Sequence, residues 1–332
     1  MYNGLLFIGD PHLTSRKPGR RTDDNHTLVV LDKIRQSLVI ANQRNLFPVI
    51  LGDLFSQSKE SCHWMLTYLY RILRENALPG ADKIICLAGN HDMRDTSLTD
   101  DTTLAMVAAT GLLNVLSTID PVVIDGLCVL YPVPSGFPLP QSVTTNGFPI
   151  IVLTHDDFAF GDSYPGAKPL AEIKGACMMV NGHMHKTERP IQMGETLCHN
   201  PGNITRVSID TRDHVPAVWE WKPVYGNNMT RIALEYKEDV FDAIGKRIAP
   251  DIASITNDSE FTKLLVAERA SEASRTEDGG MLSEDLHAII ENKKADFGSA
   301  AIAAAVEELI DQMLMEAASR NASAVVMPEE TA

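Results

Sequence analysis

Short apolar runs alternate with helix-like periodicity through the first two thirds of the chain. Apolar runs bounded by turn residues are typical of buried strands, and they occur at 5–8, 49–51, 84–87, 150–153 and 178–180. Apolar residues spaced by three and four predict helices over about 25–45, 59–76 and 102–109. Later runs predict further strands at 122–125, 127–131, 187–193, 205–210, 217–221 and 231–236. The pattern therefore predicts an α/β fold, a two-layer β-sandwich flanked by helices.

The pattern changes near residue 238, where the apolar positions take up helical spacing. It predicts helices at 239–248, 259–270, 283–292 and 299–318, with a frayed tail from about residue 321. We therefore expect two domains. Residues 1–236 form the sandwich, which is β-rich in its second half, and residues 237–332 form a C-terminal helical appendage.

The charge distribution separates these two parts further. The chain of 332 residues has a formal net charge of −15, which taken alone argues against a nucleic-acid ligand. Residues 237–332 carry 9 Lys and Arg against 20 Asp and Glu, so most of the negative charge belongs to the appendage. The acidity of the whole chain therefore does not exclude nucleic acid as a ligand of the first 236 residues.

Composition excludes several protein classes. A content of 44% hydrophobic and 22% charged residues is ordinary for a globular protein and rules out a wholly disordered or collagenous chain. The five cysteines are odd in number and include no C-x-x-C pair, which favours free thiols over a disulfide framework or a zinc knuckle. Because no basic leader and no apolar stretch of about 18 residues is present, we expect a cytoplasmic protein without a membrane-spanning segment.

Aspartate, asparagine and histidine residues follow five of the predicted strands. They stand just after the carboxyl ends of those strands, at Asp10 and His12, Asp53, Asn90 to Asp92, His155, and His183 and His185. Open α/β sheets bind ligands at this edge, and carboxylate, amide and imidazole groups suit divalent metal ions. A lone histidine is more often a core or surface residue than a ligand. Five such signals at strand ends favour a metal site over coincidence.

The spacing within these blocks, D-x-H, G-D, G-N-H-D, H and G-H-x-H, resembles the calcineurin-like metallophosphoesterase superfamily over about residues 4–210. The resemblance implies that two divalent ions are bound. The ligands it implies are Asp10, His12 and His185 for one ion, Asn90, His155 and His183 for the second, and Asp53 as the bridge between both. Manganese is the metal we expect, although Mg, Fe and Zn suit the same ligands.

The same resemblance implies a reaction. Two divalent ions clamp a phosphoryl group and generate hydroxide from bound water, which then hydrolyses the phosphodiester. His91 follows a ligand directly and would act as the general acid. Asp92 would either orient His91 or cap the turn.

Flanking residues point to a subclass. Leu13 after His12, the block Gly52-Asp53-Leu54-Phe55, and Arg21-x-x-Asp24 resemble the SbcD-like nuclease subunit of double-strand-break repair complexes, a group that includes phage recombination nucleases. Asn203 departs from that group, which usually has serine after the corresponding Pro-Gly. The resemblance implies DNA as substrate and an SMC-like ATPase as partner of the helical appendage. An apolar stripe over 299–318 fits docking of that partner, self-association as a homodimer, or packing on the body.

Four basic residues crowd the loop after His12, namely Arg16, Lys17, Arg20 and Arg21. They predict a basic lip that contacts the phosphates of a DNA backbone, with a plain solvated loop as the alternative. A small-molecule phosphodiesterase or pyrophosphatase, acting on cyclic nucleotides or nucleotide-sugar lipids, is the second enzymatic hypothesis, and the appendage and basic lip favour the nuclease over it. A non-catalytic scaffold on the same fold would need missing ligands, and none is missing.

Overall fold

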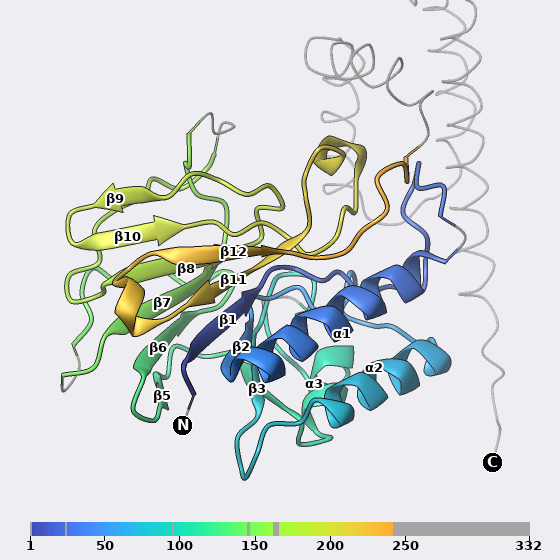
Figure 1. Ribbon diagram of the computed structural model, residues 1–332, viewed down its shortest axis with the longest axis horizontal. Helices are drawn as coiled ribbons and strands as arrows, with labels where there is room; N and C mark the ends of the chain where they lie inside the picture. Colours follow the sequence, from blue (N-terminus) through green and yellow to red (C-terminus); the bar gives the residue numbers. More distant parts are fainter. Residues whose placement is uncertain (1, 24, 95, 145–146, 162–165, 242–332) are drawn as a thin grey trace, which may run out of the picture. The chain divides into compact units, whose positions relative to one another are not determined.

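The strands of the chain form two six-stranded sheets in the computed structural model, which describes residues 2–23, 25–94, 96–144, 147–161 and 166–241 (Figure 1). The first sheet has the strand order β12-β11-β1-β2-β3-β4. Its strands are β1 (Gly4–Ile8), β2 (Leu46–Ile50), β3 (Ile84–Leu87), β4 (Leu113–Leu116), β11 (Ala217–Trp221) and β12 (Met229–Ala233).

The second sheet has the strand order β5-β6-β7-β8-β10-β9. Its strands are β5 (Val122–Ile124), β6 (Cys128–Val133), β7 (Ile150–His155), β8 (Met178–Gly182), β9 (Ile191–Met193) and β10 (Thr196–His199). In the first sheet β1, β2, β3 and β4 run parallel, and the antiparallel strand β11 lies beside β1. In the second sheet β6, β7, β8 and β10 run parallel, and an antiparallel strand lies on each side of them. Parallel strands end at one edge of their sheet, which is where the segments after β1, β2, β3, β7 and β8 meet.

Alternate residues of β7 pack into two different cores. Ile151 and Leu153 belong to the large core that includes β1, β2 and β3. Ile150 and Val152 belong to a smaller core on the other face of the second sheet. Successive side chains of a strand point to opposite faces, so a strand that is apolar throughout is buried on both of them. The second sheet is therefore buried on both faces, and one of these faces packs against the first sheet to form a sandwich.

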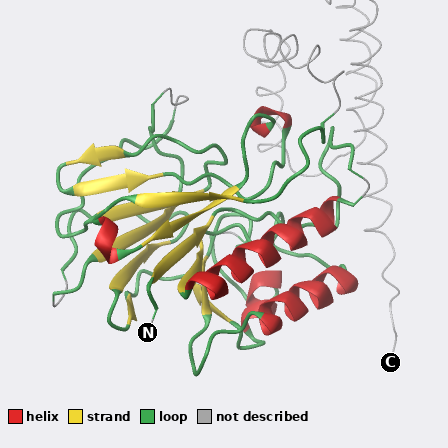
Figure 2. Ribbon diagram, in the orientation of Figure 1, coloured by secondary structure: helices red, strands yellow, loops and turns green. Residues whose placement is uncertain are grey.

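Three helices cover the face of the first sheet that turns away from the second sheet (Figures 1 and 2). They are α1 (His26–Arg44), α2 (His63–Glu75) and α3 (Thr103–Ala108). Helix α1 begins at Asn25, whose side chain accepts the backbone N–H of Leu28 at 3.1 Å. It ends at Asn45 in the left-handed conformation, with φ of 54°. Two short 3₁₀ helices, η1 (Ile209–Thr211) and η2 (Pro223–Tyr225), lie before β11 and β12.

The structure confirms the predicted fold class, with local differences. The strand predicted over 205–210 is wrong, because residues 205–208 form no strand and η1 follows them. The residues that this segment buries most deeply are polar and not apolar. Thr205 and Arg206 are 2% and 5% exposed, and the Thr205 hydroxyl donates to the carbonyl of Pro11 at 3.3 Å. The hydrophobic pattern also does not predict β4 and β10, which are only four residues long.

The C-terminal predictions fall largely outside the described residues. This holds for the helices at 259–270, 283–292 and 299–318, for most of 239–248 and for the tail from 321. The chain divides into two compact units, Met1–Pro250 and Asp251–Ala332, and the expected boundary at residue 236 stays a prediction. Among the helices that the structure describes, none is both long enough and apolar enough to cross a membrane.

Candidate metal centre

The side chains singled out by the sequence come from loops at the carboxyl ends of five parallel strands. Asp10 and His12 follow β1, Asp53 follows β2, and Asn90, His91 and Asp92 follow β3. His155 is the last residue of β7, and His183 and His185 follow β8. Both sheets therefore contribute to one group of side chains, although these residues are up to 175 positions apart in the sequence.

Unusual backbone conformations bring these loops together. Asp10, His12, Asp53 and His183 have positive φ values of 31°, 50°, 45° and 70°. Residues other than glycine adopt such values rarely, and they cluster at functional sites where the surrounding structure compensates for the strain. A methyl group on Gly89 would lie 2.1 Å from Oδ1 of Asp53. The absence of a side chain there allows the two loops to approach each other.

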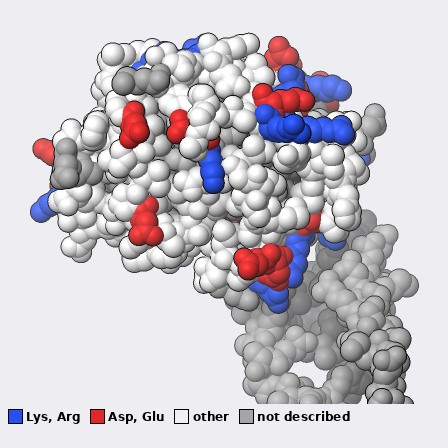
Figure 3. Space-filling view, turned by 90° about the horizontal axis from the view of Figure 1, so that it is seen from below, with Lys and Arg blue, Asp and Glu red and all other residues white. Residues whose placement is uncertain are grey.

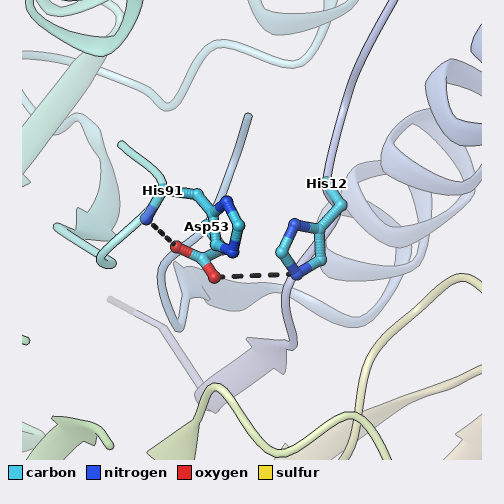
Figure 4. Close-up of side chains that lie close together, drawn as sticks. All are labelled: His12, Asp53 and His91. Atoms are coloured by element: carbon cyan, nitrogen blue, oxygen red, sulfur yellow. Dashed lines mark hydrogen bonds and ion pairs between the residues drawn. The ribbon is translucent and has the colours of Figure 1, made fainter. Parts of the chain in front are cut away.

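Asp53 lies at the centre of the cluster (Figure 4). Its Oδ1 accepts the backbone N–H of His91 at 2.9 Å. Its Oδ2 lies 3.6 Å from Nε2 of His12 and 3.1 Å from Nε2 of His155. One buried carboxylate thus faces histidines from two different strand ends.

Two further histidines stand on either side of Asp53. On one side, Nε2 of His185 lies 2.8 Å from Nε2 of His12. On the other side, the rings of His183 and His155 have their centroids 5.1 Å apart. His12, Asp53 and His91 form one group whose ligand atoms all lie within 4.8 Å of one another, and Asp53, His155 and His183 form a second such group. Asp53 is the member that both groups share.

Three of the buried side-chain atoms that lack a hydrogen-bond partner among the described residues lie in this cluster. They are Oδ2 of Asp10, Oδ2 of Asp53 and Nε2 of His155. Buried polar groups in folded proteins are nearly always paired, and each exception calls for an explanation such as a bound ion. The donor set of carboxylate oxygens and imidazole nitrogens suits divalent ions. The residues therefore fit a divalent metal site, with two candidate ligand groups that share Asp53.

The sequence profile described as calcineurin-like phosphoesterase matches residues 5–187, more than half of the chain. The chain belongs to this family. Members of this family are metal-dependent hydrolases of phosphoesters. The matched residues include the candidate metal centre, from Asp10 to His185. No curated protein sequence matches the chain.

Solved structures with a similar outline include three bacterial proteins. TT1561 of Thermus thermophilus is 9% identical with a TM-score of 0.41, covering 71% of this chain and 100% of that one. The NAD nucleotidase of Haemophilus influenzae is 11% identical with a TM-score of 0.39, covering 82% and 60%. The 5'-nucleotidase precursor of T. thermophilus is 12% identical with a TM-score of 0.40, covering 76% and 59%.

Burial and close charges shift the proton affinities of this phosphoesterase centre. Burial raises the pKa of Asp10 to about 7. Burial opposes the charge of His155, but the neighbouring Asp53 and Asp10 carboxylates raise its pKa to about 10. Burial likewise opposes the charge of Asp53, yet the adjacent His155 holds the pKa of that carboxyl below its usual range. Without metal, the centre therefore retains protons near neutral pH.

Metal binding should release these protons. Ions must displace a proton from His155 and, below about pH 7, one from Asp10, so metal affinity should rise with pH between about pH 6 and pH 8. Titration calorimetry in buffers of different ionisation enthalpy measures both the affinity and the protons released. In Asp10→Asn the part of the pH dependence due to Asp10 should disappear. Affinity that is independent of pH would contradict this account of the centre.

The position of His91 suits proton transfer. Its side chain is exposed, and its Nδ1 lies 2.9 Å from the carbonyl oxygen of Ser56. A carbonyl only accepts, so Nδ1 carries a proton in this contact and Nε2 is left for another partner. The ring of His91 is 5.2 Å from that of His12, and His91 belongs to one of the two candidate ligand groups. Its role as general acid therefore stays a prediction beside that of a ligand.

The contacts of Asp92 bear on the two roles considered for it, orienting His91 or capping the turn. Its side chain is fully buried, and its carboxylate accepts backbone N–H groups from Leu54, Phe55 and Gly89 at 3.3, 3.0 and 3.1 Å. These contacts join the loop after β2 to the loop after β3. Of the two roles considered for Asp92, the structure favours a turn-stabilising one, and the carboxylate positions the loops that carry Asp53 and His91.

Asn90 and Arg21 are two further predicted site residues. Asn90 is exposed, and its side chain makes no hydrogen bond with any residue that the structure describes, so its role as a ligand stays a prediction. Arg21 is a correction to the predicted basic lip. It is only 5% exposed, its Nε pairs with Asp23 at 2.6 Å, and its Nη1 donates to the carbonyl of Arg206. Arg16, Lys17 and Arg20 are exposed as expected.

Sequence reasoning missed a buried amide network that holds the histidine loops. Asn181 donates to the carbonyl of Asp156 and to the side chain of Asn200, both at 2.9 Å. Asn200 donates to the carbonyls of Met184 and Lys186, which flank His185. The network ties the end of β7 to the loop that carries His183 and His185. Asparagine at a strand end is common in turns, so only the proximity of Asn181 to the G-H-x-H block could have indicated this role.

Proposed function

We propose that the chain is a dinuclear metal-dependent phosphodiesterase that cleaves DNA, in the manner of recombination and repair nucleases. The observation that carries the proposal is the position of Arg16, Lys17 and Arg20. All three are exposed on the loop directly after His12. Exposed cations on a loop that begins at a predicted metal ligand support contacts with neighbouring phosphates of a polymer.

The start of this loop is fixed to the loop of the bridging carboxylate. The backbone N–H of His12 donates to the carbonyl of Asp53 at 2.9 Å, and that of Leu13 donates to the carbonyl of Leu54 at 2.8 Å. Further along, the hydroxyl of Ser15 donates to Glu60 at 3.0 Å. The basic residues therefore extend from a rigid attachment at the centre, which supports a role in positioning a substrate.

The exposure of the centre supports a polymeric substrate. Asn90 and His91 are exposed, and the side chain of His183 is 27% exposed. Sites for small molecules enclose most of their ligand, whereas a nucleic-acid backbone needs an open approach. This rim favours DNA over the cyclic nucleotides or nucleotide-sugar lipids of the second hypothesis.

Each group of the centre then has a stated part in the reaction. Asp53 would be shared between two ions, with Asp10, His12 and His185 holding one and Asn90, His155 and His183 holding the other. Divalent ions in such a pair neutralise a phosphoryl group and lower the pKa of bound water, and manganese is the ion we propose. His91, in its doubly protonated form, would donate a proton from Nε2 to the leaving oxygen while Ser56 holds its Nδ1. An SMC-like ATPase or a second copy of the chain, bound by residues 237–332 in the cytoplasm, belongs to the same proposal.

Salt dependence tests the DNA contacts. Each phosphate contact releases counterions, so log affinity falls with log salt at a slope of about −0.9 per contact. The triple variant Arg16→Gln, Lys17→Gln, Arg20→Gln should flatten the slope for duplex DNA by up to about three units. We would measure binding in a His91→Ala background, which reduces cleavage. Hydrolysis of bis-p-nitrophenyl phosphate by the same triple variant with His91 intact should change little.

A second triple variant controls for the change in net charge. Arg74, Lys83 and Lys174 are exposed and lie outside the loop, so their replacement by glutamine should leave the slope nearly unchanged. On the face of the protein shown in Figure 3, Lys and Arg side chains are interspersed with Asp and Glu and form no continuous basic surface over the described residues. Equal flattening by both triple variants, or by neither, would favour the small-molecule hypothesis over the nuclease.

A further inference from the structure

A cavity of about 430 Å³ lies between α1 and the segment that follows β12, apart from the candidate metal centre. Leu28 and Lys33 of α1, Thr205 and Arg206, and Tyr236 and Lys237 are among its lining residues. Small-molecule sites in proteins have volumes of roughly 300–1,000 Å³. The cavity is therefore large enough for a small ligand.

Lys33 is a buried cation that forms no direct ion pair with a described carboxylate. It is 3% exposed, and its ammonium group forms no hydrogen bond or ion pair with any described residue. The adjacent carboxylate of Asp32 is occupied by Arg35 at 2.7 Å and by Gln36 at 2.6 Å. Glu235 also lines the cavity, but no ion pair joins it to Lys33 in the described structure. Burial lowers the pKa of Lys33, and the Asp32 and Glu235 carboxylates attract its charge without a direct ion pair. Buried charges in proteins are normally paired directly, because burying an unpaired ammonium group is costly.

Arg206 is a second buried cation, and within the described residues its hydrogen bonds go to no carboxylate. Its guanidinium donates to the carbonyls of Arg212 at 3.0 Å and Glu238 at 3.1 Å, and to that of Lys237. It also lies over the ring of Tyr236, 4.8 Å from the centroid. These contacts fix the guanidinium, and the Glu238 and Asp239 carboxylates attract its charge without bonding to it directly. Arg21 differs, because Asp23 neutralises it.

We propose that this cavity binds a phosphate-bearing small molecule, with Lys33 and Arg206 as the cations that attract its phosphate group. Two cations without a directly bonded carboxylate match the charge of a phosphate better than that of a single carboxylate. The apolar side chains of Leu28, Val29 and Pro216 provide a surface for the body of an organic phosphate.

The cavity is connected to the loop that carries two of the predicted metal ligands. Thr205, one of its lining residues, donates from its hydroxyl to the carbonyl of Pro11, which stands between Asp10 and His12. The preceding backbone N–H, that of Ile204, donates to the carbonyl of Gly9 at 2.9 Å. An anion in the cavity would therefore lie behind this loop, separate from a phosphate bound at the metal centre.

Equilibrium dialysis of radiolabelled inorganic phosphate against the full-length, metal-loaded protein tests the proposal. Lys33→Met removes the charge and retains the length of the side chain, and it should weaken cavity binding at least about tenfold. Leu28→Trp places a bulky group at a half-exposed lining position and should block the cavity without changing its charge. Lys174→Met removes an exposed lysine elsewhere and should leave binding unchanged. Asp53→Asn should retain the cavity site while it loses phosphate bound at the metal centre.

Thermal unfolding supplies a readout that does not depend on the metal centre. Phosphate should raise the melting temperature of the wild type and of Lys174→Met, and should not do so through the cavity in Lys33→Met. Without phosphate, Lys33→Met should be at least as stable as the wild type, because it no longer buries an ammonium group that lacks a direct ion pair. Phosphate binding that is unchanged in both Lys33→Met and Leu28→Trp, or that is lost entirely in Asp53→Asn, would overturn the proposal.

Discussion

Replacing Asp53 with asparagine should abolish metal binding at the shared position and phosphoesterase activity together. The carboxylate is fully buried, and its Oδ2 faces Nε2 of both His12 and His155. A neutral amide supplies one oxygen and no charge to two dications, so both would be bound far more weakly. Loss of an outer partner of a metal ligand typically reduces affinity or activity 10–100-fold, so loss of a shared ligand should exceed about 100-fold. Metal content by mass spectrometry and turnover of bis-p-nitrophenyl phosphate measure the two effects.

The substitution is conservative for the backbone. Asp53 has φ of 45°, a left-handed conformation that asparagine tolerates better than most residues, so Asp53→Asn should keep the fold. In the metal-free protein the variant should also lower the pKa of His155, whose proton the Asp53 carboxylate stabilises. Asp82→Asn is a matched control, since Asp82 bonds to the hydroxyl of Tyr2 away from the centre. Full metal content with near-normal turnover in Asp53→Asn would remove Asp53 from the centre.

The sequence predicts the position of the centre because two simple regularities coincide. Strands buried on both faces are uninterrupted apolar runs, so their ends are easy to locate, as for β1, β3 and β8. Parallel strands bring those ends to one edge, so polar residues such as Asp10, Asp53 and His183 can be grouped without coordinates. The motif spacing then predicts a metal centre, and the structure brings these side chains together.

The remaining details depend on contacts between distant segments. Arg21 stands in a run of basic residues that is typical of a solvated loop, and its burial follows from contacts with Arg206 and Phe241. In the sequence, Asp92 is adjacent to His91 and suggests a partner for it. In the structure, its carboxylate accepts hydrogen bonds from the backbone of Leu54 and Phe55. Local patterns describe neighbours in the sequence and contain no information on these pairings.

Removing the imidazole of His91 should slow the cleavage of DNA by about 100-fold or more while both metals stay bound, since general acids contribute about 10²–10⁴-fold. Protonation by a general acid speeds the reaction only when the leaving oxygen departs poorly without a proton. His91→Ala should therefore lose much less activity toward bis-p-nitrophenyl phosphate, whose leaving group departs without protonation. If His91 were a metal ligand or a purely structural residue, its replacement would slow both reactions alike.

Metal content and a matched histidine variant complete this test. His63→Ala removes an exposed histidine on α2, outside the cluster, and should leave both activities unchanged. His91 also stands with His12 and Asp53 in a group able to hold an ion, so the alternative role as ligand is specific. If His91→Ala loses one metal and slows both substrates equally, His91 is a ligand. If the metals remain and only DNA cleavage slows, the proton on Nε2 is what the reaction requires, and the Ser56 carbonyl, which accepts from Nδ1, orients and stabilises the imidazolium that carries it.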